Sequence, residues 1–330
     1  MKSAVVSLLL ALLALSPALA VTPVPRRLAV ARICGHDYIS VSDWAIANGF
    51  AAHWLKRDES LQLANDSSRI TLTVDSAEAE INGVGVRLLF PVCKRPDGVF
   101  LALLDAQSTF HPLLSPPKNR PGERIKTICL DPGHGGKDPG FQVGSHDEKQ
   151  YTLLLAQELR NQLLRAGFKV SLTRTRDAYV ELPDRPVVAN RRKADLFISL
   201  HFNSAAASAV SVQGAEVYCM TPVGAPSSNA HGEGAGAGWF PGNQNNEKNL
   251  VLAYQLQKAI AHGTQAEDRA ARRARYWVLR DATMPSALIE AGYMSHPLEG
   301  RKIFDPTYRR QIALAIVDGI LAYKRIVERP

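Results

Sequence analysis

Two histidines and two glutamates stand where short patterned runs of the sequence begin or end. His134 lies in the glycine-rich segment 131–140, and Glu148 opens a helical pattern. His201 and Glu290 each follow an apolar run. A catalytic zinc ion commonly has three nitrogen or oxygen ligands and a fourth position for water, whose pKa it can lower to about 7. Two histidines and one glutamate make such a ligand set, which leaves the other glutamate to transfer protons.

The elements that must position these residues alternate between strands and helices. Tyr151, Leu155, Leu159 and Leu163 recur every four residues, as in a helix, and Gly167 can end that helix. Apolar runs of strand length occur at 125–130, 169–173, 196–200, 215–220, 277–279 and 287–289. This alternation predicts an α/β fold, with a mostly parallel or mixed sheet and helices on both faces. Ligands of such sheets bind beyond the carboxyl ends of the strands, so the four residues are expected at one edge.

Two more helices complete this part of the chain. A helix is predicted at 249–262, where Gly263 ends it, and a final helix begins at Asp305-Pro306. The apolar face of the final helix includes Ile312, Ile316 and Ile320.

Several neighbouring polar residues admit a structural interpretation. His146 and Asp147 directly precede Glu148 and compete with it as metal ligands. Asp131 and Asp138 are expected to shape the glycine-rich loop. Structural ion pairs are the default interpretation for Arg174, Arg269 and Arg280, and an exposed surface position is the default for His231 and His296.

The first twenty residues have the pattern of an export signal. Lys2 supplies the positive start, residues 4–15 are apolar, and Ala18-Leu19-Ala20 offers a cleavage site between small residues. The apolar run is shorter than the roughly 20 residues that a membrane span needs, so a stable membrane anchor is not expected. Residues 1–20 therefore predict export to the periplasm or cell envelope.

Residues 28–115 predict a small α+β module with an internal repeat. Tyr38–Asp43 followed by 44–54 is similar to Val99–Asp105 followed by 106–114, each a short extended run leading into a helix. The runs 61–64, 69–74 and 79–89 alternate as strands do, and Asn82-Gly83 is a strong hairpin turn. Residues 116–123, rich in proline, predict a linker to a second domain at 124–330.

Composition narrows the function less than the motifs do. The chain has 330 residues, 46% of them hydrophobic, and a formal net charge of +8. A basic surface could attract an anionic polymer, but no aromatic and basic module for nucleic acid is recognisable. Cys34 and Cys93 precede the two repeats at similar offsets, so a disulfide and two separate thiols both remain open.

Four ordered motifs make 124–325 similar to the zinc-dependent N-acetylmuramoyl-L-alanine amidase family. They are Asp131–Gly140, Asp147-Glu148-Lys149, Ile198–Asn203 and Pro285–Ser295. The resemblance implies that His134, Glu148 and His201 bind one zinc ion and that Glu290 is the catalytic general base and acid. It also implies a substrate, peptidoglycan, and a reaction, hydrolysis of the amide between N-acetylmuramic acid and L-alanine. Asn203 and the glycine-rich backbone could orient that substrate.

The resemblance leaves some points open. Residues 28–115 are similar to the copper amine oxidase N-terminal-like repeat domain, whose name implies no copper here. His296 and Ala270 stand where family members often have Asn and Gly. The variable segment 221–247 predicts a flexible loop that faces the substrate, with Trp239 and Phe240 as sugar or peptide contacts. A zinc peptidase acting on stem peptides and a non-catalytic wall-binding regulator are the alternatives, and the oligomeric state is open.

Overall fold

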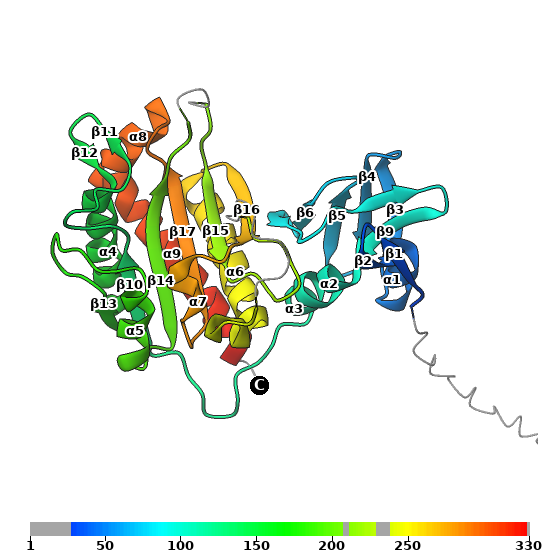
Figure 1. Ribbon diagram of the computed structural model, residues 1–330, viewed down its shortest axis with the longest axis horizontal. Helices are drawn as coiled ribbons and strands as arrows, with labels where there is room; N and C mark the ends of the chain where they lie inside the picture. Colours follow the sequence, from blue (N-terminus) through cyan, green and yellow to red (C-terminus); the bar gives the residue numbers. More distant parts are fainter. Residues whose placement is uncertain (1–27, 207–210, 229–237, 329–330) are drawn as a thin grey trace, which may run out of the picture.

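The computed structural model describes residues 28–206, 211–228 and 238–328 (Figure 1). The predicted export signal at 1–20 lies outside these residues, as does His231. Among the described helices, none combines the length and the apolar character that crossing a bilayer requires.

Among the described residues of the carboxy-terminal part, six strands form the sheet. Their order is β13 (Lys169–Leu172), β10 (Thr127–Pro132), β14 (Leu196–Asn203), β17 (Ser286–Tyr293), β15 (Ala215–Cys219) and β16 (Asp268–Arg273). All neighbours are parallel except β15 and β17, which pair antiparallel. The predicted mixed α/β sheet is confirmed. Both β14 and β17 extend beyond the predicted runs, so that His201 and Glu290 lie within strands.

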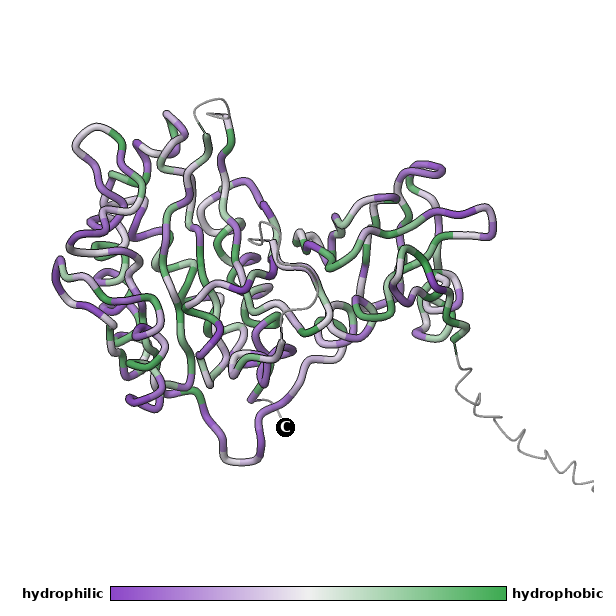
Figure 2. The backbone as a smooth tube through the Cα atoms, in the orientation of Figure 1, coloured by the Kyte–Doolittle hydropathy of each residue, from purple (hydrophilic) through white to green (hydrophobic). Residues whose placement is uncertain are grey.

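Helices cover both faces of this sheet, as predicted. On one face, α4 (Glu148–Arg165), α6 (Asn246–Thr264) and α9 (Pro306–Glu328) pack over Ile128 and Leu130. On the other, α5 (Asp184–Arg191) and α7 (Trp277–Arg280) pack over Cys129. Successive side chains of a strand point to opposite faces, which is why β10 contributes to both cores. Figure 2 shows the central strands largely hydrophobic and the loop at the bottom, which precedes β10, largely hydrophilic.

Two local predictions are wrong, and a third is wrong over part of its length. Residues 277–279 form part of α7, because a short apolar run can be helix as readily as strand. Helix α6 continues through Gly263 and ends at Thr264, and Gln265 caps it with a φ of +57°. In the predicted flexible loop, Pro241–Asn245 form the 3-10 helix η3 and 246–247 begin α6. Residues 229–237 of that loop lie outside the described residues.

From residue 28 onward, where the structure describes the chain, the amino-terminal part is built from nine strands and a few short helices. The meander contains β3 (Ala51–Lys56), β4 (Ser60–Ala64), β5 (Arg69–Thr73), β6 (Glu78–Ile81) and β7 (Val84–Arg87). The smaller sheet contains β1 (Val30–Ile33), β2 (His36–Ser40), β9 (Gly98–Ala102) and β8 (Cys93–Arg95), in that order. Asn82-Gly83 turns the β6–β7 hairpin with both φ angles positive, as its sequence predicts.

The two predicted copies of the repeat lie side by side. Strands β2 and β9 pair antiparallel, with Tyr38 opposite Ala102. Strand β2 leads into α1 (Val41–Ala47), and β9 leads into α2 (Leu103–Asp105), a π-helical turn (Ala106–Phe110) and α3 (His111–Leu114). The first helix is shorter than predicted, because 51–56 form β3. Cys34 and Cys93 are both free thiols.

The large sheet does not stop at the boundary between the two parts. Strand β7 pairs with β16 in parallel through Val86 and Ala271, which extends the sheet into the meander (Figure 1). The Gly85 amide donates to Asp268 Oδ2 at 2.8 Å. Tyr254 of α6 donates to the Ile81 carbonyl oxygen at 2.8 Å. The two parts are therefore joined by the β7–β16 strand pair and by helix α6.

Candidate active site

The glycine-rich loop after β10 places His134 against His201 in a tight turn. His134 has a φ of +60°, which is uncommon for residues other than glycine. A Cβ added at Gly133 would overlap the His201 imidazole, so only glycine lets the loop approach β14 so closely. A Cβ at Gly140 would lie 2.7 Å from Glu148 Oε2, which shows the same crowding on the other side of the loop.

Three side chains bring their ligand atoms together at this edge. His134 Nε2 lies 3.1 Å from Glu148 Oε2, and His201 Nδ1 lies 3.1 Å from Glu148 Oε1. The two imidazole rings meet edge to face, with centroids 4.9 Å apart. One ligand atom from each of the three residues lies within 4.8 Å of the others. The structure therefore brings together the three residues that the sequence suggested as metal ligands.

The charges around these residues favour an ionised Glu148. Burial alone would raise its pKa, but hydrogen bonds and charge from His134 and His201 hold the pKa of Glu148 well below its ordinary value. Burial likewise opposes the charged form of His134, yet Glu148 and Asp138 raise the pKa of His134. Asp138 Oδ2 lies 2.8 Å from His134 Nδ1, the ring nitrogen on the far side from Glu148. Asp138 thus fixes the ring orientation of His134 as well as shaping the loop.

Glu290 lies beside this cluster on the neighbouring strand. It is the register partner of His201 on β14 and of Glu216 on β15. Its Oε2 atom is buried without a hydrogen-bond partner among the described residues. Burial, followed by the charges of Glu148 and Glu216, raises the pKa of Glu290 well above its ordinary value. A carboxyl group whose pKa is raised in this way holds a proton more readily than an ordinary glutamate, which suits a general acid and base.

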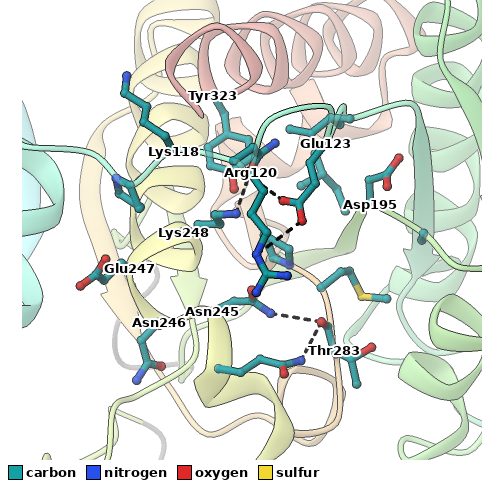
Figure 3. Close-up of a pocket in the computed structure, with 18 of the residues that line it drawn as sticks. Lys118, Arg120, Glu123, Asp195, Asn245, Asn246, Glu247, Lys248, Thr283 and Tyr323 are labelled. Atoms are coloured by element: carbon teal, nitrogen blue, oxygen red, sulfur yellow. Dashed lines mark hydrogen bonds and ion pairs between the residues drawn. The ribbon is translucent and has the colours of Figure 1, made fainter. Parts of the chain in front are cut away.

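All four residues line one cavity of about 290 Å³. Its other walls come from 182, 202–204, 276–278 and 288. A larger cavity of about 900 Å³ lies beside the loop that precedes β10, and Arg120, Lys248 and Tyr323 are among the residues that line it (Figure 3). It contains none of the four residues, so its size does not make it the reaction site. The smaller cavity holds the convergent titratable groups that define a candidate active site.

The competing ligands are held elsewhere. His146 stacks on Phe304 with ring centroids 3.9 Å apart, and its Nδ1 meets the Tyr151 hydroxyl. Asp147 accepts a hydrogen bond from Gln142 at 2.7 Å within the β11 (Gln142–Val143) and β12 (His146–Asp147) hairpin. Neither belongs to the cluster of ligand atoms around Glu148.

Two buried arginines support the loop. Arg185 pairs with the fully buried Asp131 at 2.9 Å and also donates to the His134 carbonyl oxygen. Arg174 donates to the carbonyl oxygens of Pro132 and Gly133, and it forms no ion pair with any residue that the structure describes. Asp131 shapes the loop as expected, whereas Arg174 acts through backbone hydrogen bonds.

The remaining predicted positions lie near the rim. Arg269 lies 3.8 Å from Glu216 and 3.7 Å from Glu267, so it is an ion-pair residue as predicted. Arg280 stacks on Trp277 and Phe240 at 4.5 and 5.0 Å. Trp239 is 63% exposed. His296 accepts from the Glu299 amide and caps α8 (Pro297–Phe304), so it is not a plain surface residue.

Glu216 is the residue near the site that sequence reasoning missed. It lies in the apolar run of β15, and its side chain is only 3% exposed. Arg272 contacts it at 3.0 Å, and the Tyr293 hydroxyl donates to it at 3.1 Å. Burial of a glutamate within an apolar strand is energetically unfavourable. The presence of Glu216 in such a run was therefore the sequence feature that could have identified it.

Comparisons with known proteins identify the family of this chain. A family profile described as N-acetylmuramoyl-L-alanine amidase matches residues 128–322. The chain belongs to this family. The probable cell wall amidase LytH of Staphylococcus epidermidis is 36% identical over 201 residues, 60% of this chain and 58% of that protein. The N-acetylmuramoyl-L-alanine amidase AmiC of Neisseria meningitidis is 33% identical over 230 residues, 63% of this chain and 55% of that protein.

Solved structures lead to the same family. An N-acetylmuramoyl-L-alanine amidase from Clostridium difficile 630 has a TM-score of 0.51 and 30% identity over 61% of this chain and 97% of its own. AmiC2 of Nostoc punctiforme has a TM-score of 0.51 and 31% identity over 61% of this chain and 98% of its own. The chain spans little more than half the length of the two sequence relatives, at 58% and 55%.

Proposed function

We propose that this chain hydrolyses the amide bond between N-acetylmuramic acid and L-alanine in peptidoglycan, with zinc held by His134, Glu148 and His201. The observation that carries the proposal is the convergence of these ligand atoms to within 4.8 Å, in the cavity that also contains Glu290. The names of the relatives, cell wall amidase and N-acetylmuramoyl-L-alanine amidase, support the choice of bond.

The donor set suits a catalytic zinc ion. Two imidazole nitrogens and one carboxylate are a common set for catalytic zinc, and a carboxylate behind a ligating histidine is a common outer partner. Asp138 supplies that partner to His134 at 2.8 Å. A bound zinc ion would supply Lewis-acid chemistry for amide hydrolysis.

The side chains of the site have distinct tasks in the proposed reaction. Glu290 takes a proton from the attacking water as the water oxygen adds to the amide carbonyl carbon. The carbon–nitrogen bond then breaks, and Glu290 returns the proton to the alanine nitrogen as it leaves. The buried Oε2 of Glu290 and its raised pKa suit a group that must hold a proton between these two steps.

The proposal extends to the organisation of the chain. Residues 1–20 act as an export signal, which places the enzyme in the periplasm or cell envelope, where peptidoglycan is its partner. Residues 28–115 form a repeat module similar to the copper amine oxidase N-terminal-like domain, 116–123 form a linker, and 124–330 form the amidase domain. The β2–β9 pairing of the two repeat copies supports the repeat module.

Digestion of purified peptidoglycan tests the proposal. The wild type should release intact stem peptides and leave unsubstituted glycan, while Glu290→Gln should retain zinc and release almost none. Glu267→Gln, which removes a 56% exposed carboxylate, is the matched control and should behave as the wild type. Shortened stem peptides would indicate a peptidase instead. Absence of release by the wild type would leave the regulator as the alternative.

A further inference from the structure

We propose that Asn203 donates a hydrogen bond to a carbonyl oxygen of the substrate, and that Glu216 is the positioning residue that orients the Asn203 amide. This inference rests on the proposed function, because it concerns the substrate of the same cavity. Neither residue belongs to the proposed ligand set or to the proton transfer.

The side chain of Asn203 lines the cavity two residues beyond His201. One of its two amide N–H groups donates to Glu216 Oε1 at 2.5 Å, and its Oδ1 accepts from the Ser204 amide at 2.8 Å. A side-chain amide has two N–H donors. Within the described parts of the chain, the second donor of Asn203 has no hydrogen-bond partner. It is therefore available to an acceptor that enters the cavity.

Glu216 decides which way the amide faces. The oxygen and nitrogen of an amide side chain are nearly the same size, so sterics alone do not distinguish its two orientations. If the amide of Asn203 turned over, Oδ1 would face the Glu216 carboxylate and Nδ2 would face the Ser204 N–H. Both contacts would be repulsive. A carboxylate at 216 therefore keeps Nδ2 of Asn203 facing Glu216, which fixes the direction of the second N–H.

The surroundings hold Glu216 itself in place. The Tyr293 hydroxyl donates to the same Oε1 atom at 3.1 Å, and Arg272 Nε lies 3.0 Å from Oε2. Arg269 adds a second cation at 3.8 Å. Two arginines on β16 thus compensate a carboxylate that is 3% exposed, and they approach the oxygen atom that Asn203 does not use.

A purely structural role explains this arrangement poorly. Glu216 is directly opposite Glu290 across β15 and β17, and like charges opposite each other destabilise a strand pair. An apolar residue at 216 would avoid both that repulsion and the burial of a charge. A hydrogen-bond acceptor at position 216 is needed to orient the Asn203 amide. This role explains why a carboxylate is buried there despite the unfavourable free energy.

The acceptor is a carbonyl oxygen of the muramoyl peptide. Asn203 lines the cavity that His201 and Glu290 also line, where the scissile amide must bind. Peptidoglycan offers carbonyl oxygens in its acetamido groups and along its stem peptide. A neutral donor suits such acceptors, since hydrogen bonds between neutral groups contribute modest, direction-dependent affinity.

Binding of a soluble muropeptide, a disaccharide carrying one stem peptide, tests the inference without requiring turnover. Isothermal calorimetry on zinc-loaded Glu290→Gln protein gives the reference Kd. Adding Asn203→Ala should weaken binding about tenfold, the loss of one hydrogen bond. Adding Glu216→Gln should weaken it by roughly threefold, because a glutamine lets the amide turn over. Glu267→Gln, which removes the other carboxylate near Arg269, should leave Kd unchanged.

The double variant separates positioning from simple support. If Glu216 acts through Asn203, Glu216→Gln should add no further loss once Asn203 is alanine, whereas independent effects would multiply to about 30-fold. Asn203→Asp also lacks the amide donor and should bind as weakly as Asn203→Ala. It provides a second test of the donor if the Glu216 variant does not fold. Three outcomes would each overturn the inference. They are an unchanged Kd for Asn203→Ala, losses of affinity that multiply in the double variant, and no muropeptide binding at all. Absence of stem-peptide release by the wild type, with Asn203-dependent binding intact, would instead overturn only the proposed reaction.

Discussion

His201 and Glu290 are register partners on the adjacent parallel strands β14 and β17. Their side chains therefore leave the same face of the sheet at neighbouring positions. This pairing places the proposed proton-transfer group beside a proposed metal ligand without any help from loops. The other two ligands come from less regular positions, the glycine-rich loop and the first turn of α4.

Asp138→Asn should weaken zinc binding by about 10- to 100-fold, because Asp138 orients the His134 ring through its Nδ1 atom. Competition with a zinc chelator measures the affinity. Asp147→Asn is the matched control, since Asp147 binds Gln142 in the β11–β12 hairpin and should not affect the metal. Wild-type affinity in Asp138→Asn would show that the carboxylate plays no part in holding His134.

Gly133→Ala should lower zinc affinity and stem-peptide release by at least about tenfold, because the added methyl group needs the space of the His201 ring. Gly238→Ala adds a methyl group where nothing lies within 4 Å, and it should match the wild type. Thermal unfolding of both proteins distinguishes a displaced ligand from a failure to fold. If Gly133→Ala bound zinc normally, the close approach of the loop to β14 would be unnecessary.

Glu290→Gln should stabilise the metal-free protein at neutral pH. The pKa of Glu290 is raised in the folded state, so ionisation costs folding free energy as pH rises from the ordinary glutamate pKa through the folded-state value. Below the ordinary value both states are protonated and the variant should gain nothing. Melting temperatures measured from acidic to neutral pH with a chelator present should show a gain that grows with pH. A gain independent of pH would contradict the assigned burial cost.

The sequence predicted the site better than the path of the chain around it. His134, Glu148, His201 and Glu290 could be placed at one edge because strand ends in a mainly parallel sheet converge. Strand β16 was missed, since its sequence, Asp268 to Arg273, is charged at four of six positions and becomes a strand only between β15 and β7. Tertiary pairing overrides local propensity in such a strand.

The contacts that tune the site depend on atoms that sequence patterns do not specify. Asp138 was expected to shape its loop, but its contact with His134 Nδ1 depends on the positive φ of His134. Glu216 has no sequence motif of its own and reaches Glu290 only through the antiparallel pairing of β15 with β17. The junction of β7 with β16 likewise depends on tertiary packing, which joins strands that the sequence assigned to separate domains.

Metal analysis of the purified protein tests the central claim most directly. The proteins compared are the wild type, His201→Ala and the surface control His262→Ala, each shown to be folded. Elemental analysis should give about one zinc per chain for the wild type and for His262→Ala, and almost none for His201→Ala. Stem-peptide release should be lost with the metal and return when zinc is restored to chelated wild type. A metal-free wild type that degrades peptidoglycan at the normal rate would contradict the account.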